Sequence, residues 1–110
     1  MSREYRLFLQ DMRKASEKIL RYTRGFSCEQ FLADEKTFDA VMRDLEIIGE
    51  AAKHIPPEAR AQHPEIDWQK IAGLRDIVVH EYFGLDVEII WDVIMREVPT
   101  LLRQLKPLTE

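Results

Sequence analysis

The sequence contains few of the residues that build tight turns. Its 110 residues include only 4 Gly and 5 Pro, which leaves little material for the many short turns of a β-sandwich or β-barrel. Hydrophobic residues make up 45% and charged residues 33% of the chain, a balance that excludes an intrinsically disordered protein. The length corresponds to a single domain, residues 1–110, with a core of modest size.

Cysteine and long apolar runs are also scarce. Cys28 is the single cysteine, so the sequence predicts no disulfide within the chain. No apolar stretch approaches the roughly 20 residues that cross a bilayer, and the first residues lack the apolar core of a secretion signal. We therefore expect a cytoplasmic protein that has no contact with a membrane.

A surplus of basic charge is missing as well. The formal net charge is −4, which argues against loose, non-specific wrapping of nucleic acid. The distribution is uneven, because residues 1–25 carry seven basic and three acidic side chains, whereas the rest of the chain carries nine and 17. The first helix can therefore present a basic stripe to RNA or to an acidic partner, although charge alone favours an ordinary solvated helix face.

Helical periodicity, by contrast, runs through the whole sequence. Apolar residues recur every three or four positions, as on the buried face of an amphipathic helix. The predicted helices cover residues 3–24, 35–55 and 68–83 and the segment from 87 onward, with a short helix after Ser27 and one turn over 58–62. Pro99 predicts a kink or break near Val98. No segment alternates as a half-buried strand does, so we expect an all-α fold, an antiparallel bundle of four to five helices.

Capping residues mark the expected helix ends. Gly25 and Gly84 stand where C-terminal cap glycines belong. Ser27 and Gln30 have the spacing of a capping box. The other candidate N-caps are Asp34, Asp67 and Asp86. These residues divide the chain into helices that short loops connect, as antiparallel neighbours require.

The helix predicted over 68–83 is apolar on nearly all sides. A helix of this kind must be buried on several faces, and a domain of 110 residues has few elements with which to cover it. Left exposed, its branched and aromatic side chains would form an unfavourable surface. We therefore expect a homodimer in which this helix contacts a second copy of the chain.

The same helix carries four polar residues that can support chemistry. Asp76 and His80 are four residues apart, so they share a face and can form a hydrogen bond that orients the imidazole. Arg75 and Tyr82 are seven residues apart and also share a face. Arg75 and His80, however, are five apart, which separates them by about 140° around an ideal helix. Either the helix is distorted near His80, or the working site combines residues of two subunits.

These residue types suit RNA cleavage. A histidine with a near-neutral pKa can take the proton of a ribose 2′-hydroxyl or protonate the leaving oxygen, and an arginine fork matches phosphate oxygens. Tyr82 can position the RNA backbone or stack on a base. This chemistry requires no metal and no cofactor. From spacing alone, though, an Arg, Asp and His on one helix more often form a buried polar network than an active site.

Acidic and histidine residues elsewhere give weaker signals. Glu50, on the long helix over 35–55, either faces the site and pairs with Arg75 or belongs to a solvated helix face, and the sequence favours neither reading. Glu50 and His54 have metal-ligand spacing, but no second pair accompanies them. His80 begins a zinc-protease pattern that fails because position 84 is Gly84. We therefore predict no metal site.

The segment Arg75-x4-His80-x-Tyr82 resembles the R-x4-H-x-Y signature of HEPN-domain toxins of the HepT family. The flanking segments Ile48–Lys53, Asp67–Asp76 and Phe83–Trp91 resemble that family too, and the similarity extends over about residues 5–105. The resemblance implies a helical bundle that dimerises through the motif-bearing helices and brings two R-x4-H motifs to one cleft. It also implies a metal-independent endoribonuclease, with Arg75 and His80 as the catalytic pair and Asp76, Tyr82 and Glu50 in support.

The resemblance further implies a biological setting. Proteins of this type are toxins of type VII-like toxin–antitoxin systems, and their antitoxin is a minimal nucleotidyltransferase (MNT) that neutralises them by transferring AMP from ATP to the motif tyrosine, here Tyr82. An anionic adenylate beside Arg75 and His80 would repel an RNA phosphate. HEPN domains also serve as non-catalytic nucleotide-binding or substrate-binding subunits of nucleotidyltransferases. That alternative remains open, since both readings use the same residues.

Overall fold

The computed structural model describes residues 4–82 and 87–110, with only the backbone described for residues 80–82. The elements are α1 (Tyr5–Thr23), α2 (Cys28–Ala33), α3 (Glu35–Lys53), α4 (Pro57–Gln62), α5 (Trp68–Ala72), α6 (Leu74–Tyr82), α7 (Val87–Asp92), a π-helical segment (Val93–Glu97) and α8 (Val98–Thr109). Within the described residues there is no strand, so the predicted all-α fold class is confirmed.

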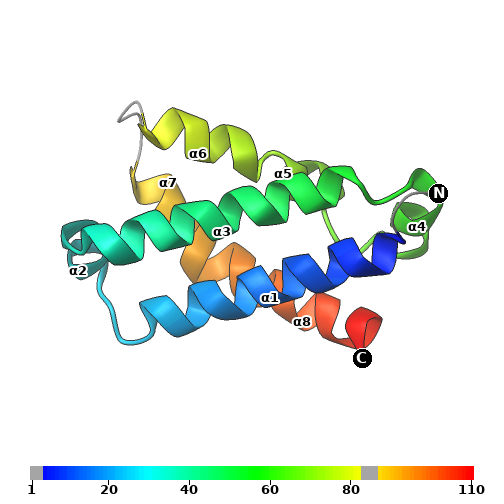
Figure 1. The fold of residues 1–110 in the computed structure, drawn as a ribbon, viewed down its shortest axis with the longest axis horizontal. Coiled ribbons are helices and arrows are strands. Elements are labelled where there is room, and N and C mark those ends of the chain that lie inside the picture. The colour runs from blue at the N-terminus through cyan, green and yellow to red at the C-terminus, as the bar shows by residue number, and fades with distance from the viewer. Residues whose placement is uncertain (1–3, 83–86) are drawn as a thin grey trace.

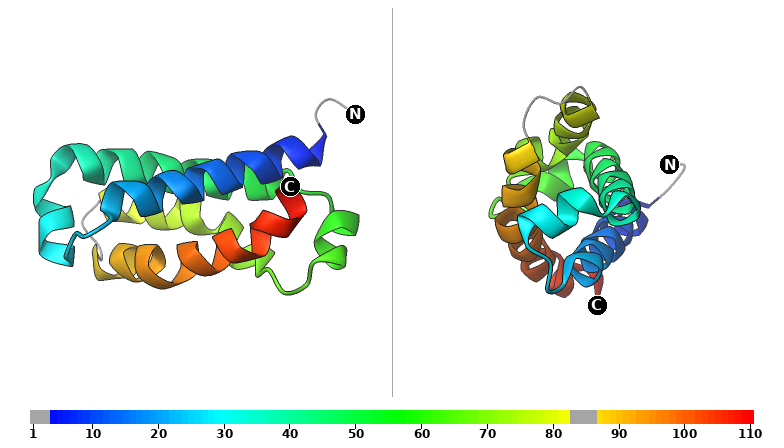
Figure 2. Two further views of the ribbon diagram at one scale, coloured as in Figure 1. Left: turned by 90° about the horizontal axis from the view of Figure 1, so that it is seen from below. Right: turned by 90° about the vertical axis from the view of Figure 1, so that its left-hand side faces the viewer.

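Successive long segments of the described chain run in alternating directions along the molecule (Figure 1). Helices α1 and α3 lie side by side, and α8 packs against α1. Helices α5 and α6 pack against α3, and the chain then returns through α7 to α8 (Figures 1 and 2). Short helix α2 crosses the end of the bundle between α1 and α3, as the end-on view in Figure 2 shows. The predicted antiparallel bundle is therefore present.

Helix α3 lies at the centre of the fold. Most of its apolar stripe is buried, and it packs against α1 as well as against α5 and α6. The fully buried residues of this stripe are Val41, Met42, Leu45, Ile48 and Ala52. The same helix buries a charge, since Asp44 is 5% exposed. Burial raises the pKa of the Asp44 carboxyl, and the nearby cations Lys18, Arg43 and Arg21 offset only part of this effect.

Local capping signals explain where several helices begin and end. The capping box of Ser27 and Gln30 is present at the start of α2, and the side chain of Asp34 accepts a hydrogen bond from the Thr37 N–H at the start of α3. Asp67 caps α5 in the same way. Gly25 follows α1 with φ at +79°, a backbone conformation that favours glycine. The predicted helix end at Gly84 and N-cap at Asp86 lie outside the described residues.

One predicted helix is divided in two. The segment over 68–83 does not form a continuous helix, because the chain tightens at Gly73 between α5 and α6. The N–H of Asp76 donates to the Gly73 carbonyl three residues earlier, which is the pattern of a tighter turn. Both of the resulting helices, α5 and α6, pack against α3.

The distortion predicted from Pro99 takes the form of a wider turn. Proline has no N–H with which to bond the carbonyl four residues earlier. The five residues Val93–Glu97 form a π-helix, in which the N–H of Val98 donates to the Val93 carbonyl, and Pro99 then falls in the first turn of α8. The π-helical turn contains one residue more than an α-helical turn, and this extra residue accommodates the missing proline N–H without interrupting the helical segment.

None of the described helices is long and apolar enough to cross a membrane.

Candidate functional site

A close approach of two helices positions Arg75. Gly49 of α3 lies directly against the start of α6, where a Cβ atom on Gly49 would come within 2.9 Å of the Arg75 backbone nitrogen and 3.3 Å of the Ala72 carbonyl oxygen. Only glycine permits this contact without a shift of backbone. The backbone of Arg75 therefore lies directly against α3.

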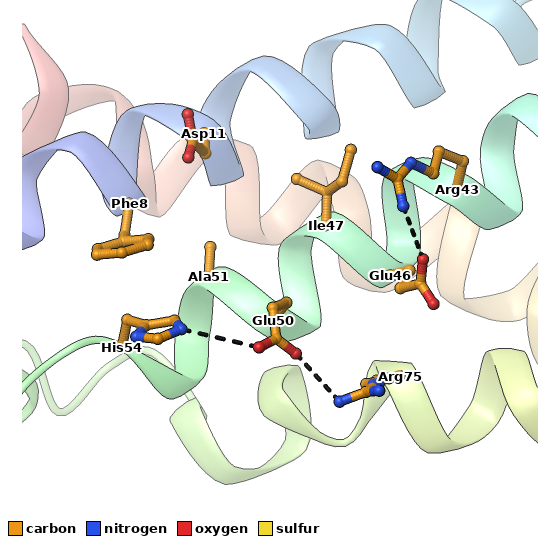
Figure 3. Close-up of a pocket in the computed structure, with 9 residues that line it drawn as sticks. All are labelled: Phe8, Asp11, Arg43, Glu46, Ile47, Glu50, Ala51, His54 and Arg75. Carbon is orange, nitrogen blue, oxygen red and sulfur yellow. Dashed lines mark hydrogen bonds and ion pairs between the residues drawn. The ribbon is translucent and has the colours of Figure 1, made fainter.

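A cluster of three charged or titratable side chains forms at this crossing (Figure 3). Arg75 Nη1 lies 3.2 Å from Glu50 Oε2, and His54 Nε2 lies 3.7 Å from Glu50 Oε1. The contact between Glu50 and Arg75 considered from the sequence is thus present. Each of the three side chains is about half exposed, at 49%, 50% and 52% for Arg75, Glu50 and His54. Solvent-exposed pairs of this kind add little stability, so the cluster leaves Arg75 oriented and open to a ligand.

The cluster borders a groove of about 440 Å³ that runs along α3 between α1 and α6. Phe8 and Asp11 of α1 form one side, and Arg75 forms the other (Figure 3). The floor is made by successive turns of α3, namely Arg43, Glu46, Ile47, Glu50, Ala51 and His54. Arg43 Nη1 is 3.0 Å from Glu46 Oε1. At the far end, the rings of Phe8 and His54 are stacked, with centroids 4.5 Å apart and planes 10° apart.

The remaining motif residues lie along α6. Asp76 is exposed in its first turn. His80 and Tyr82 lie in its final turn, and their side chains fall outside the described part of the chain, as does the predicted contact between Asp76 and His80. The backbone from Leu74 to Tyr82 is α-helical, so the positions of Arg75 and His80 are about 140° apart around the helix axis. A helix distortion between them is not observed.

Apolar residues of α5 and α6 divide between core and surface. Ile71, Leu74 and Val78 are buried in the core, while Val79 is 45% exposed. On α7, which contacts α6, Ile89 is 47% exposed. Branched apolar side chains, those of Val79 and Ile89, are therefore exposed to solvent near the motif.

Sequence reasoning missed part of this site. His54 looks like an ordinary surface residue in the sequence, and nothing local links it to Phe8, which is 46 positions away. The spacing of Arg43, Glu50 and His54 along α3 is the one signal that shows a continuous polar edge. Among the described side chains, no three His, Cys, Asp or Glu residues gather closely enough to hold a metal ion.

Comparison with known proteins identifies the family of this chain. The chain matches the family described as "Ribonuclease HepT-like" over residues 12–108. It is 45% identical over 101 residues to the "Probable ribonuclease HepT" of Thermococcus cleftensis, covering 92% of each chain. It is also 40% identical over 105 residues to "Putative RNase TTE0752" of Caldanaerobacter subterraneus, covering 96% of this chain and 94% of that protein.

A third relative, "Putative RNase MJ0127" of Methanocaldococcus jannaschii, is 38% identical over 104 residues, which cover 94% of this chain and 86% of that protein. No solved structure matches the chain significantly. The family match includes nearly all of the helical bundle and the whole segment from Arg75 to Tyr82. The chain therefore belongs to the HepT-like ribonuclease family of HEPN proteins.

Proposed function

We propose that this protein is a metal-independent endoribonuclease and the toxin of a type VII-like toxin–antitoxin system. The observation that carries the proposal is the family match over residues 12–108, which includes an Arg75 guanidinium that is half exposed and held by Glu50 at the edge of a groove. Relatives that cover most of the chain bear ribonuclease names.

In the proposed reaction, Arg75 and His80 act on one phosphodiester. Arg75 donates hydrogen bonds to the phosphate oxygens and stabilises the charge that develops on them. His80 serves as general base for the ribose 2′-hydroxyl or as general acid for the leaving oxygen. Asp76 orients the His80 imidazole, and Tyr82 forms the wall of the site. Glu50 is a positioning residue, because its carboxylate fixes the direction of the Arg75 guanidinium.

The proposed enzyme is a homodimer with a site that two protomers share. The positions of Arg75 and His80 are about 140° apart around the axis of a regular α6, so one helix does not bring both residues to a single phosphate. A twofold axis beside α6 would place the Arg75 of one protomer opposite the His80 of the other. The exposed apolar side chains of Val79 and Ile89 give such an interface its hydrophobic component.

The proposed antitoxin is an MNT-type nucleotidyltransferase that transfers AMP to Tyr82. An adenylate on Tyr82 adds bulk and negative charge to the helix that carries Arg75, which opposes the approach of an RNA phosphate. Co-expression with a nucleotidyltransferase encoded beside this gene should add the mass of AMP to the wild type and leave Tyr82→Phe unmodified. Modification of another residue, with Tyr82 left untouched, would contradict this part of the proposal.

RNA degradation in excess chelator tests the catalytic claim. We expect the purified wild type to cleave single-stranded RNA in chelator, and His80→Ala to lose that activity while retaining its helical circular dichroism spectrum. His63→Ala is the matched control, because His63 lies in the loop after α4 and outside the groove. Equal cleavage by wild type and His80→Ala would exclude His80 as a catalyst. RNA binding with no cleavage by the wild type would favour the non-catalytic binding subunit.

A further inference from the structure

Two stacked rings stand at the end of the groove farthest from Arg43. The imidazole of His54 lies nearly parallel to the ring of Phe8, with a 10° angle between their planes. Phe8 covers one face of the imidazole, and the Glu50 carboxylate lies 3.7 Å from its Nε2. The His54 side chain nevertheless remains 52% exposed. A planar ring that is fixed on one face and open to solvent is suited to stacking on a second planar group.

The charges around this ring select against a phosphate. The carboxylates of Asp11, Glu46 and Glu50 outnumber the guanidinium groups of Arg43 and Arg75 among the residues that line the groove. This excess of carboxylates, with Glu50 beside the imidazole, disfavours an anion on His54, whereas a neutral planar ligand meets no such penalty. The surroundings of His54 therefore fit a nucleobase better than a phosphate, and Arg75 is the group in the groove that can contact a neighbouring phosphate.

The ring also lies next to the arginine of the motif. A single carboxylate, that of Glu50, contacts both Arg75 and His54 through its two oxygens (Figure 3). A phosphate on Arg75 and a base on His54 would thus occupy neighbouring positions on one strand. The groove volume of about 440 Å³ falls in the range of small-ligand sites, which is enough room for one nucleotide.

We propose that His54, supported by Phe8, forms a base-stacking subsite for an unpaired nucleotide of single-stranded RNA. The base stacks on the imidazole, and the adjoining phosphate contacts Arg75. This proposal rests on the proposed function in one respect, namely that the ligand is RNA. It assigns His54 a role in holding the strand, separate from the proton transfer proposed for His80.

Binding of a non-cleavable strand tests the subsite. The probe is a fluorescein-labelled 2′-O-methyl hexa-adenylate, which lacks the free 2′-hydroxyl needed for cleavage, and binding is followed by fluorescence anisotropy over a series of salt concentrations. Loss of a stacked base costs about fivefold or more in affinity, so we expect His54→Ala to raise Kd at least about fivefold. His54→Phe retains a ring and should bind within about twofold of wild type. His63→Ala is the matched control and should bind as the wild type does.

The salt dependence separates stacking from a contact with phosphate. A stacking role leaves the slope of log Kd against log salt unchanged in His54→Ala, whereas Arg75→Ala lowers it. A reduced slope in His54→Ala, together with no rescue by His54→Phe, would mean that the imidazolium binds phosphate and would overturn the proposal. An unchanged Kd in His54→Ala, or a wild type that fails to bind the probe, would overturn it too.

A second probe keeps the test independent of the variants. The wild type should bind an abasic strand of the same length at least about fivefold more weakly than the hexa-adenylate, and equal affinity would contradict a base subsite. Because neither probe can be cleaved, these results do not depend on ribonuclease activity. An inactive wild type that still shows the base and His54 dependence would reject the proposed catalysis and leave the subsite in place.

Discussion

Replacing Gly49 by alanine tests how the fold positions Arg75. The new Cβ atom would lie 2.9 Å from the Arg75 backbone nitrogen and 3.3 Å from the Ala72 carbonyl oxygen. Both are backbone atoms, so no side-chain rotation relieves the contact. Helices α3 and α6 must therefore move apart, and the contact between Arg75 and Glu50 must move with them.

The size of the effect follows from two opposing terms. Overpacking of a rigid contact costs about 1–3 kcal/mol, and we place this case near the upper end because both neighbours are backbone. Alanine restores about 1 kcal/mol of helix propensity relative to glycine. The net loss of unfolding free energy is about 1–2 kcal/mol, or a fall in Tm of roughly 5–10 °C for a domain of this size.

Thermal and urea denaturation followed by circular dichroism measure this loss. Lys53→Ala is the control, since Lys53 is exposed on the same helix, and its unfolding free energy should change by less than about 0.5 kcal/mol. A Gly49→Ala protein as stable as the wild type, or more stable, would refute the close approach of α3 and α6 on which the position of Arg75 depends.

Substitutions at three further positions test the fold. Trp68→Phe removes an indole N–H that donates to the carbonyls of Arg60 and His63. It should lower the unfolding free energy by about 1–3 kcal/mol in urea titrations. An unchanged urea midpoint would show that these hydrogen bonds add nothing to the stability of the fold. Asp34→Ala removes the N-cap of α3 and should cost about 1 kcal/mol by the same assay, whereas Asp34→Asn should cost less. Asp44→Asn should raise stability near neutral pH, because burial raises the pKa of the Asp44 carboxyl above its ordinary value of 3.8 and the wild type must hold a disfavoured charge there. A raised folded-state pKa stabilises the protein only at low pH, and this contribution is lost as the pH rises above 3.8. The gain from Asp44→Asn should therefore shrink as the pH falls toward 3.8, and a gain that grows on acidification would contradict the assignment.

The parts of the fold that sequence reasoning predicted are those with local causes. The helices α1 and α3 carry long apolar stripes, and Ser27, Asp34 and Asp67 cap helices through side chains three residues from their partners. The division at Gly73 and the π-helix before Pro99 depend on packing against the rest of the bundle. A proline predicts a distortion near its position, but the sequence does not show whether the helix will break or will include an extra residue in one turn.

The candidate site likewise has a part that local sequence could predict and a part that depends on the folded chain. Arg75, Asp76, His80 and Tyr82 occupy one helix, and their spacing together with the resemblance to the HepT family predicted a site there. Arg75 and Glu50 are 25 positions apart and lie on two different helices. The sequence therefore did not show whether they would be in contact. The stacking of Phe8 on His54 was not predicted, because α1 and the end of α3 meet only in the folded chain.

In the proposed enzyme, Arg75 of one protomer and His80 of the other form one RNA-cleaving site. Complementation tests this directly, with the Arg75→Ala and His80→Ala chains co-expressed, purified and assayed on RNA in excess chelator. Each variant alone should be inactive, and the mixture should regain about a quarter of wild-type activity, because half of the dimers are mixed and each mixed dimer keeps one intact site of two. A mixture as inactive as its components, with mixed dimers demonstrated by native mass spectrometry, would contradict the shared site.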